Sequence, residues 1–307
     1  MSATTAEERW LRQPAREIMP PMRRRGLLFV LCGLALGLAV LLGAAVGTVA
    51  IPPQTVAQML VARLPFLHMA AQWPATFETI LFEIRLPRVA LMALSGAALA
   101  ASGATYQGLF RNPLADPYLI GVAAGAGLGA TLAITVGLPH TVWGLNVVPL
   151  AAYLGGLMTV TLVVLIARVG RTAPVTTLIL AGVAVGSFAV SLTTALMLRS
   201  PDGMRRAFGW MLGGYSTVGW DPVQVMAPYV VVGLAVLQVY ARLLNVLQLD
   251  EEQARQLGLN VERLKLTLVA TATLVTATAV AFSGLIGFVG LIVPHIMRLI
   301  GGPDHRR

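Results

Sequence analysis

Two arginines, Arg85 and Arg88, stand directly before an uncharged stretch of the chain, residues 89–110. Arginine carries a rigid, planar fork of N–H donors that matches the two oxygens of a carboxylate. Charged pairs at the rim of an interface mainly set the orientation and the rate of association. Arginines at this position exceed what membrane topology signals explain, and they invite a functional interpretation. The alternative is that their stems lie along an apolar surface while the charged heads reach water.

A polar segment, residues 111–117, follows the same uncharged stretch. Pro113 and Pro117 restrict the backbone and interrupt a helix. The side chains of Asn112 and Asp116 can accept hydrogen bonds from backbone N–H groups that the interruption leaves free. We interpret this segment as a capped, structural break between two helices. A role in gating is the alternative.

A third group of charges lies in residues 249–265, with the sequence LDEEQARQLGLNVERLK. Asp250 can cap a helix. Glu251 stands four residues before Arg255, which is the favourable order for an ion pair on a helix surface. Gly258 can end this helix in the left-handed conformation. The pattern predicts a short helix that a glycine terminates.

A second short helix is expected to begin after Asn260 and to carry Glu262 and Arg263. A plain connector between helices needs only about two to eight residues. The longer segment is therefore a candidate docking element for a cytoplasmic partner, and an interfacial loop is the alternative. The residues assigned to docking are Asp250, Glu251, Glu252, Arg255, Gln256, Leu257, Gly258 and Leu259.

Several kinds of chemistry lack the residues that they need. Lys265 is the only lysine and follows Leu264, so the Gly-Lys pair of a nucleotide-binding P-loop is absent. Any ATP must therefore be bound by another chain. Cys32 is the only cysteine, which excludes a disulfide within the chain. For His295 we prefer a hydrogen bond to a neighbouring helix over a role in binding haem or metal. We expect no catalytic residue, no cofactor and no metal site.

The elements that position these residues must lie in lipid. Hydrophobic residues make up 57% of the chain and charged residues 11%, with a mean hydropathy of +0.78, whereas a soluble domain is about 25% charged. Uncharged runs predict an all-α, multi-pass membrane bundle of about eight spans. The runs are Gly26–Ile51, Val89–Phe110, Pro117–Ala167, Thr172–Leu198, Pro222–Ala241 and Leu266–Met297. Two are too long for one helix and are expected to break near residues 137–146 and 282–287.

The positions of glycines and of basic residues also indicate a membrane bundle. Glycines recur at four-residue spacing within the runs, at Gly121, Gly125 and Gly129 and at Gly182 and Gly186. This spacing predicts close contact between helix backbones. The net charge of +9 comes from arginines at the ends of the runs, which is typical of membrane topology signals and argues against nucleic-acid binding. Residues 1–25, which end in three arginines, are expected to form a cytoplasmic tail before a permanent first span.

Three segments, residues 85–130, 251–265 and 283–306, resemble the FecCD family of permeases from type II ABC importers for iron–siderophore complexes, haem and cobalamin. The resemblance covers nearly the whole chain from about Gly26 onward. It implies a homodimer of permeases in the lipid of the bacterial cytoplasmic (inner) membrane. Two cytoplasmic ATPases would use ATP and Mg below it, and an extracytoplasmic substrate-binding protein would dock above.

The resemblance also implies roles for individual residues. Asp250 to Lys265 matches the coupling helices that sit in a cleft of the ATPase. Arg85 and Arg88 match the extracytoplasmic arginines that meet carboxylates of the binding protein. Gly287, Gly290, Pro294 and His295 belong to the third resembling segment, and we assign them to a structural motif together with the 111–117 break.

The family usually has about ten spans, and its pattern continues past Arg307 with two more. We therefore expect residues 26–307 to form a permease domain without its last two spans. The predicted function is the membrane subunit of an ATP-driven importer, with an iron–siderophore complex as the first candidate cargo. Haem and cobalamin are the alternative cargoes, and an ion-coupled secondary carrier is the alternative class of protein.

Overall fold

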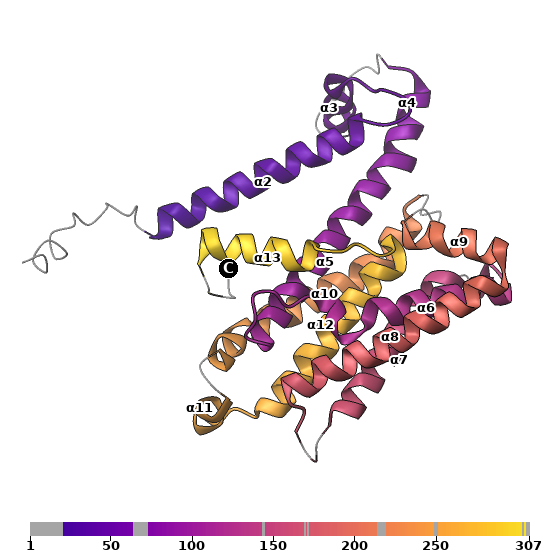
Figure 1. The fold of residues 1–307 in the computed structure, drawn as a ribbon. Coiled ribbons are helices and arrows are strands. Elements are labelled where there is room, and N and C mark those ends of the chain that lie inside the picture. Colours follow the sequence, from indigo (N-terminus) through magenta and orange to yellow (C-terminus); the bar gives the residue numbers. More distant parts are fainter. Residues whose placement is uncertain are drawn as a thin grey trace, which may run out of the picture.

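The chain forms a bundle of membrane-length helices. The computed structural model describes residues 21–63, 73–142, 145–168, 170, 172–213, 219–248, 251–302 and 304. Within them, six helices are long and apolar enough to cross a membrane, and two shorter apolar helices accompany them. These numbers agree with the prediction of about eight spans. Figure 1 shows α2 running out to one side of the remaining helices.

The helices and strands follow one another in this order: α2 (Pro21–Ala45), α3 (Pro53–Ala62), α4 (Ala75–Thr79), the π-helix η1 (Ile80–Arg85), α5 (Leu86–Leu109), the 3-10 helix η2 (Pro117–Ile120), α6 (Val122–Val136), β1 (Thr141–Val142), β2 (Leu145–Asn146), α7 (Val147–Ala167), α8 (Val175–Arg199), α9 (Pro201–Met211), α10 (Asp221–Leu247), α11 (Glu251–Gln256), α12 (Val261–Ser283) and α13 (Val289–Gly301).

Helix α12 is the centre of the bundle and packs against α5, α7 and α10. From Val269 to Ser283 its buried positions are all small or β-branched, so the neighbouring backbones approach closely. Hydroxyl groups hold α5 to it: Ser102 donates to the carbonyl of Ala272 at 3.1 Å, and the hydroxyl of Tyr106 lies 2.9 Å from that of Thr273. In lipid such contacts replace the hydrophobic driving force that holds soluble helices together.

The glycine spacing brings helix backbones into direct contact, as predicted. A Cβ on Gly125 would lie 2.5 Å from the carbonyl oxygen of Gly155, and one on Gly129 would lie 2.1 Å from that of Ala151. Both contacts join α6 to α7. On α8, a Cβ on Gly182 would lie 2.3 Å from the carbonyl oxygen of Leu119. These sites admit no side chain larger than hydrogen.

Both long uncharged runs break where turn-forming residues predicted. Gly137, with φ +72°, ends α6, and the short antiparallel strands β1 and β2 lead into α7. The second break lies between α12 and α13, where Gly284 has φ +74° and Phe288 has φ +67°. A positive φ at phenylalanine is unusual and holds the chain in a sharp turn.

One span extends beyond the uncharged run that predicted it. α4, η1 and α5 form one continuous helical rod, Ala75–Leu109, of 35 residues. At about 1.5 Å per residue it is about 52 Å long, whereas the hydrocarbon core is about 30 Å thick. Residues 89–109 are long enough to cross that core. The first part of the rod, including Arg85 and Arg88, therefore projects past it.

Candidate functional site

The segment from α11 to the start of α12 has the predicted order of helix, glycine and helix. α11 covers Glu251–Gln256, and Gly258 follows it with φ +84°. Leu259 donates its backbone N–H to the carbonyl of Ala254 at 3.2 Å, which closes the turn. The side chain of Asn260 accepts a hydrogen bond from the backbone N–H of Arg263 at 3.1 Å and caps α12.

The second helix of this segment is not short, which corrects the sequence expectation. Val261 to Lys265 form the first turns of α12, a span of 23 residues. Any displacement of the segment is therefore applied directly to the central helix of the bundle. The sequence suggested a separate helix because Glu262, Arg263 and Lys265 are charged, but only this end of α12 leaves the apolar run.

The side chains assigned to docking differ in exposure. Glu252, Gln256 and Gly258 are exposed, Leu259 is half-buried, and Leu257 is 67% exposed although it is apolar. Ala254, by contrast, is fully buried against the bundle. Asp250 lies outside the described residues, and only the backbone of Glu251 is described. The exposed surface consists of charged and amide groups around one apolar side chain.

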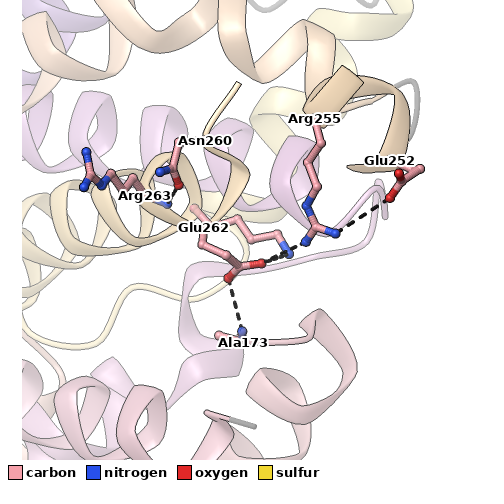
Figure 2. A network of polar contacts seen from close by, with 7 residues as sticks. Ala173, Glu252, Arg255, Asn260, Glu262 and Arg263 are labelled. Carbon is pink, nitrogen blue, oxygen red and sulfur yellow. Dashed lines mark hydrogen bonds and ion pairs between the residues drawn. The ribbon is translucent and has the colours of Figure 1, made fainter. Parts of the chain in front are cut away.

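Glu262 joins three parts of the chain at this end of the bundle (Figure 2). Its Oε2 accepts a hydrogen bond from the backbone N–H of Ala173 at 3.2 Å, in the segment between α7 and α8. Its Oε1 lies 3.4 Å from Nη2 of Arg255 and 3.6 Å from Nζ of Lys265. Arg255 also lies 3.8 Å from Glu252. Sequence reasoning missed this cluster, although the three-residue spacing of Glu262 and Lys265 on a helix was a signal for it.

The two arginines of the projecting rod have different surroundings. Arg88 is exposed. Arg85 is only 8% exposed. Its guanidinium donates to two backbone carbonyls at the end of α2, Ala44 at 2.7 Å and Ala45 at 2.8 Å, and to that of Val49 just beyond it. This geometry makes Arg85 a clamp between two helices of its own chain. Arg88 keeps its head available to a partner.

Other contacts fix the same end of the bundle. Trp220, just before α10, donates its indole N–H to the carbonyl of Phe82 at 2.9 Å. The guanidinium of Arg63 lies 4.6 Å from the ring centroid of Phe82, within cation–π range. The start of α10 and the end of α3 are thereby tied to the π-helix η1.

The 111–117 segment forms a capped break. Asn112 accepts a hydrogen bond from the backbone N–H of Leu114 at 2.9 Å, and Asp116 accepts one from that of Tyr118 at 2.8 Å. Burial raises the pKa of the Asp116 carboxyl, and its hydrogen bond from Tyr118 opposes that shift. Pro117 begins η2.

The third resembling segment packs against this break and against α5. A Cβ on Gly290 would lie 2.8 Å from Cδ of Pro117, and one on Gly103 would lie 1.9 Å from the carbonyl oxygen of Gly290. The hydroxyl of Tyr118 donates to the carbonyl of Ile286 at 3.0 Å. These contacts favour the structural interpretation of both motifs.

The remaining members of the motif contribute unequally. Pro294 is buried within α13, whereas a Cβ on Gly287 would meet no atom within 4 Å. Pro113 lies in the turn after Asn112. His295 is half-buried in α13 and forms no hydrogen bond with the residues that the structure describes, so the expected bond to a neighbouring helix is not observed. Among those same residues, no group of three or more His, Cys, Asp or Glu side chains is placed to hold a metal ion.

Comparison with known proteins identifies relatives over most of the chain. A cobalamin import system permease protein, BtuC, of Halobacterium salinarum is 48% identical over 233 residues, which cover 76% of this chain and 62% of that protein. The ABC transporter permease protein YvrB of Bacillus subtilis, whose function is uncharacterized, is 41% identical over 75% of this chain and 65% of its own length. The chain thus spans less than two thirds of the length of these two relatives.

A vitamin B12 import system permease protein, BtuC, of Escherichia coli is 40% identical over 260 residues, covering 81% of this chain and 77% of that protein. Among solved structures, an inward-facing conformation of a metal-chelate type ABC transporter superposes with a TM-score of 0.77 and 28% identity, over 94% of this chain and 84% of that one. The family model of the FecCD transport family matches residues 31–307. The chain is a multi-pass membrane protein and belongs to the FecCD transport family.

Proposed function

We propose that this chain is the permease subunit of an ATP-driven importer. The observation that carries the proposal is the exposed element α11–Gly258, which is joined directly to the central helix α12 in a member of the FecCD transport family. A charged helix outside the apolar runs offers a surface to which an ATPase can bind. Its junction with α12, closed by the hydrogen bond from Leu259 to Ala254, gives a route for movement into the bundle.

The energy source is proposed to be a separate cytoplasmic ATPase dimer that uses ATP and Mg. The only lysine of the chain, Lys265, follows a leucine, so the chain has no Gly-Lys pair of a P-loop. We place α11, the start of α12 and the basic N-terminus on the cytoplasmic side. A second copy of the permease is proposed to complete the pathway, as the family resemblance implies.

The opposite end of the bundle is proposed to receive an extracytoplasmic binding protein. Arg88 is exposed on a helical rod that projects past the hydrocarbon core, where its guanidinium can meet a carboxylate. Arg85 supports this surface from within by holding the end of α2 against the rod. The docking role is therefore proposed for Arg88 and a supporting role for Arg85.

Cobalamin is proposed as the first cargo to test. Two of the relatives carry names that specify cobalamin or vitamin B12 import, whereas an iron–siderophore complex was the first candidate from the resemblance alone. The similar solved structure is described as a metal-chelate type transporter, and cobalamin is itself a metal chelate. Ferric siderophores and haem remain the alternatives.

Co-purification with the cognate ATPase tests the proposal. The tagged chain should retain the ATPase in detergent, and Leu257→Glu should release it because it puts a charge on the exposed apolar position of the coupling surface. Leu138→Glu is the matched control, since Leu138 is an exposed leucine just past the end of α6, where a charge does not enter lipid. The proposal would be contradicted if neither the wild type nor the control retained the ATPase.

A further inference from the structure

Three separate parts of the chain meet on one carboxylate at the α11 end of the bundle. The Glu262 carboxylate accepts the backbone N–H of Ala173 through Oε2 and contacts Arg255 and Lys265 through Oε1. Arg255 belongs to α11, Glu262 and Lys265 to α12, and Ala173 to the segment before α8. In Figure 2 the Glu262 side chain lies between Arg255 on one side and Ala173 on the other.

The burial of this cluster makes its contacts persistent. The side chain of Lys265 is 5% exposed and that of Glu262 is 22% exposed, while that of Arg255 is 45% exposed. A charge held this far from water is costly unless an opposite charge stays close. The Glu262–Lys265 pair therefore stays in place on α12. Arg255 is the most exposed member and belongs to α11, so it moves with that helix.

Ala173, which donates its backbone N–H to Glu262, lies in the connection between α7 and α8. Ala173 is buried and packs in one cluster with Val163 and Ala167 of α7 and with Leu178 and Ala181 of α8. A shift of the Ala173 backbone therefore reaches both helices. A cavity of about 240 Å³ adjoins this contact, lined by Arg168, Gly170, Thr172, Ala173, Glu262 and Leu266. The cavity leaves room for Thr172 and Ala173 to move against α12.

We propose that Glu262 is a positioning residue that transmits displacement of α11 to the segment between α7 and α8, and so to α8. The inference rests on the proposed function, in which an ATPase moves α11. It adds a second route of transmission beside the direct junction of α11 with α12. Without the Glu262 carboxylate, α11 can still be held by the ATPase, but α8 no longer follows it.

Two variants separate the two halves of the link. Glu262→Gln keeps a carbonyl oxygen that can accept the Ala173 N–H but removes the charge that attracts Arg255 and Lys265. Glu262→Ala removes both halves. Asp202→Asn is the matched control, because it removes one exposed carboxylate charge in the first turn of α9, outside the segment assigned to ATPase docking. The measurements are ATPase co-purification, ATP-driven cobalamin uptake in proteoliposomes, and amide hydrogen exchange at residues 172–178.

The expected result is that both Glu262 variants retain the ATPase while uptake falls about tenfold or more, the size of an ordinary coupling between sites. Binding of ATP to the complex should change amide exchange at residues 172–178 in the wild type and in Asp202→Asn, and much less in either Glu262 variant. Glu262→Gln, which preserves side-chain shape, carries the test if Glu262→Ala fails to fold.

Wild-type uptake together with a wild-type exchange response in Glu262→Gln would overturn the inference. Failure of the proposed function gives a different pattern, because the wild type itself would then neither retain the ATPase nor import cargo. Loss of ATPase binding in Glu262→Gln alone would also overturn the inference, since it would make Glu262 part of the docking surface and not a link behind it.

Discussion

Replacing Arg85 by alanine should loosen α2 from the projecting rod. The guanidinium donates to the carbonyls of Ala44, Ala45 and Val49, and a hydrogen bond from a charged donor is worth about 1.5–3 kcal/mol. The three contacts do not add fully, because Val49 is exposed and water can reach its freed carbonyl, whereas Ala44 and Ala45 are buried. We therefore expect the free energy of unfolding to fall by about 2–4 kcal/mol.

Gly47 allows a second, independent test of the same contact. A Cβ at Gly47 would lie 2.5 Å from Nη2 of Arg85 and 2.9 Å from its Cζ, closer than ordinary van der Waals contact. Gly47→Ala should displace the guanidinium and cost about 1–2 kcal/mol. In the Arg85→Ala background the clash is gone, so the same glycine change should cost almost nothing.

The assay is the free energy of unfolding of the four chains of this double-mutant cycle, measured in one detergent, with Arg88→Ala as the matched control. Arg88 is exposed, so its loss should change stability by no more than about 0.5 kcal/mol. Additive effects of Gly47→Ala and Arg85→Ala, or an Arg85→Ala chain as stable as Arg88→Ala, would refute the clamp.

Three further substitutions test other parts of the account. Gly103→Ala should lower the free energy of unfolding by about 1–3 kcal/mol in chemical denaturation, because its Cβ would lie 1.9 Å from the carbonyl oxygen of Gly290; Gly96→Ala on the same helix meets nothing within 4 Å and should be neutral or stabilising. Asp116→Ala should cost about 1 kcal/mol through loss of a cap, whereas Asp116→Asn keeps an acceptor. Burial raises the pKa of Asp116 in the folded chain, so its contribution to stability is present at pH values below the ordinary carboxyl pKa and is lost as the pH rises through the raised pKa. The free energy of unfolding, measured as a function of pH, should show this loss in the wild type and not in Asp116→Asn. Leu257→Ala should leave stability within about 0.5 kcal/mol but weaken ATPase retention in a pull-down, and unchanged retention would remove Leu257 from the docking surface.

Features that depend on local sequence were predictable. The lengths of the uncharged runs gave the spans, because a helix must stay apolar across the whole hydrocarbon core. Turn-forming glycines located both breaks, and Gly137 and Gly284 indeed have positive φ. Asn260 and Gly258 marked the ends of helices at α11 and α12 because their roles depend on residues three or four positions away.

Features that join distant segments were not predictable from one sequence. The partners of Arg85 lie 36 to 41 positions away, and Ala173 lies 89 positions from Glu262. An arginine at the end of an apolar run has the same local pattern whether it faces a partner protein or a neighbouring helix. Burial decides between these roles, and burial comes from the packing of α2 against the rod.

ATP-driven uptake of labelled cobalamin tests the central claim most directly. The chain would be reconstituted in proteoliposomes with its cognate ATPase and binding protein, with ATP on the ATPase side. The account predicts uptake that requires ATP and its hydrolysis. Unlabelled cobalamin should compete with the labelled cargo, whereas a ferric siderophore or haem should not. Uptake that persists without ATP and follows an imposed proton or sodium gradient would contradict it.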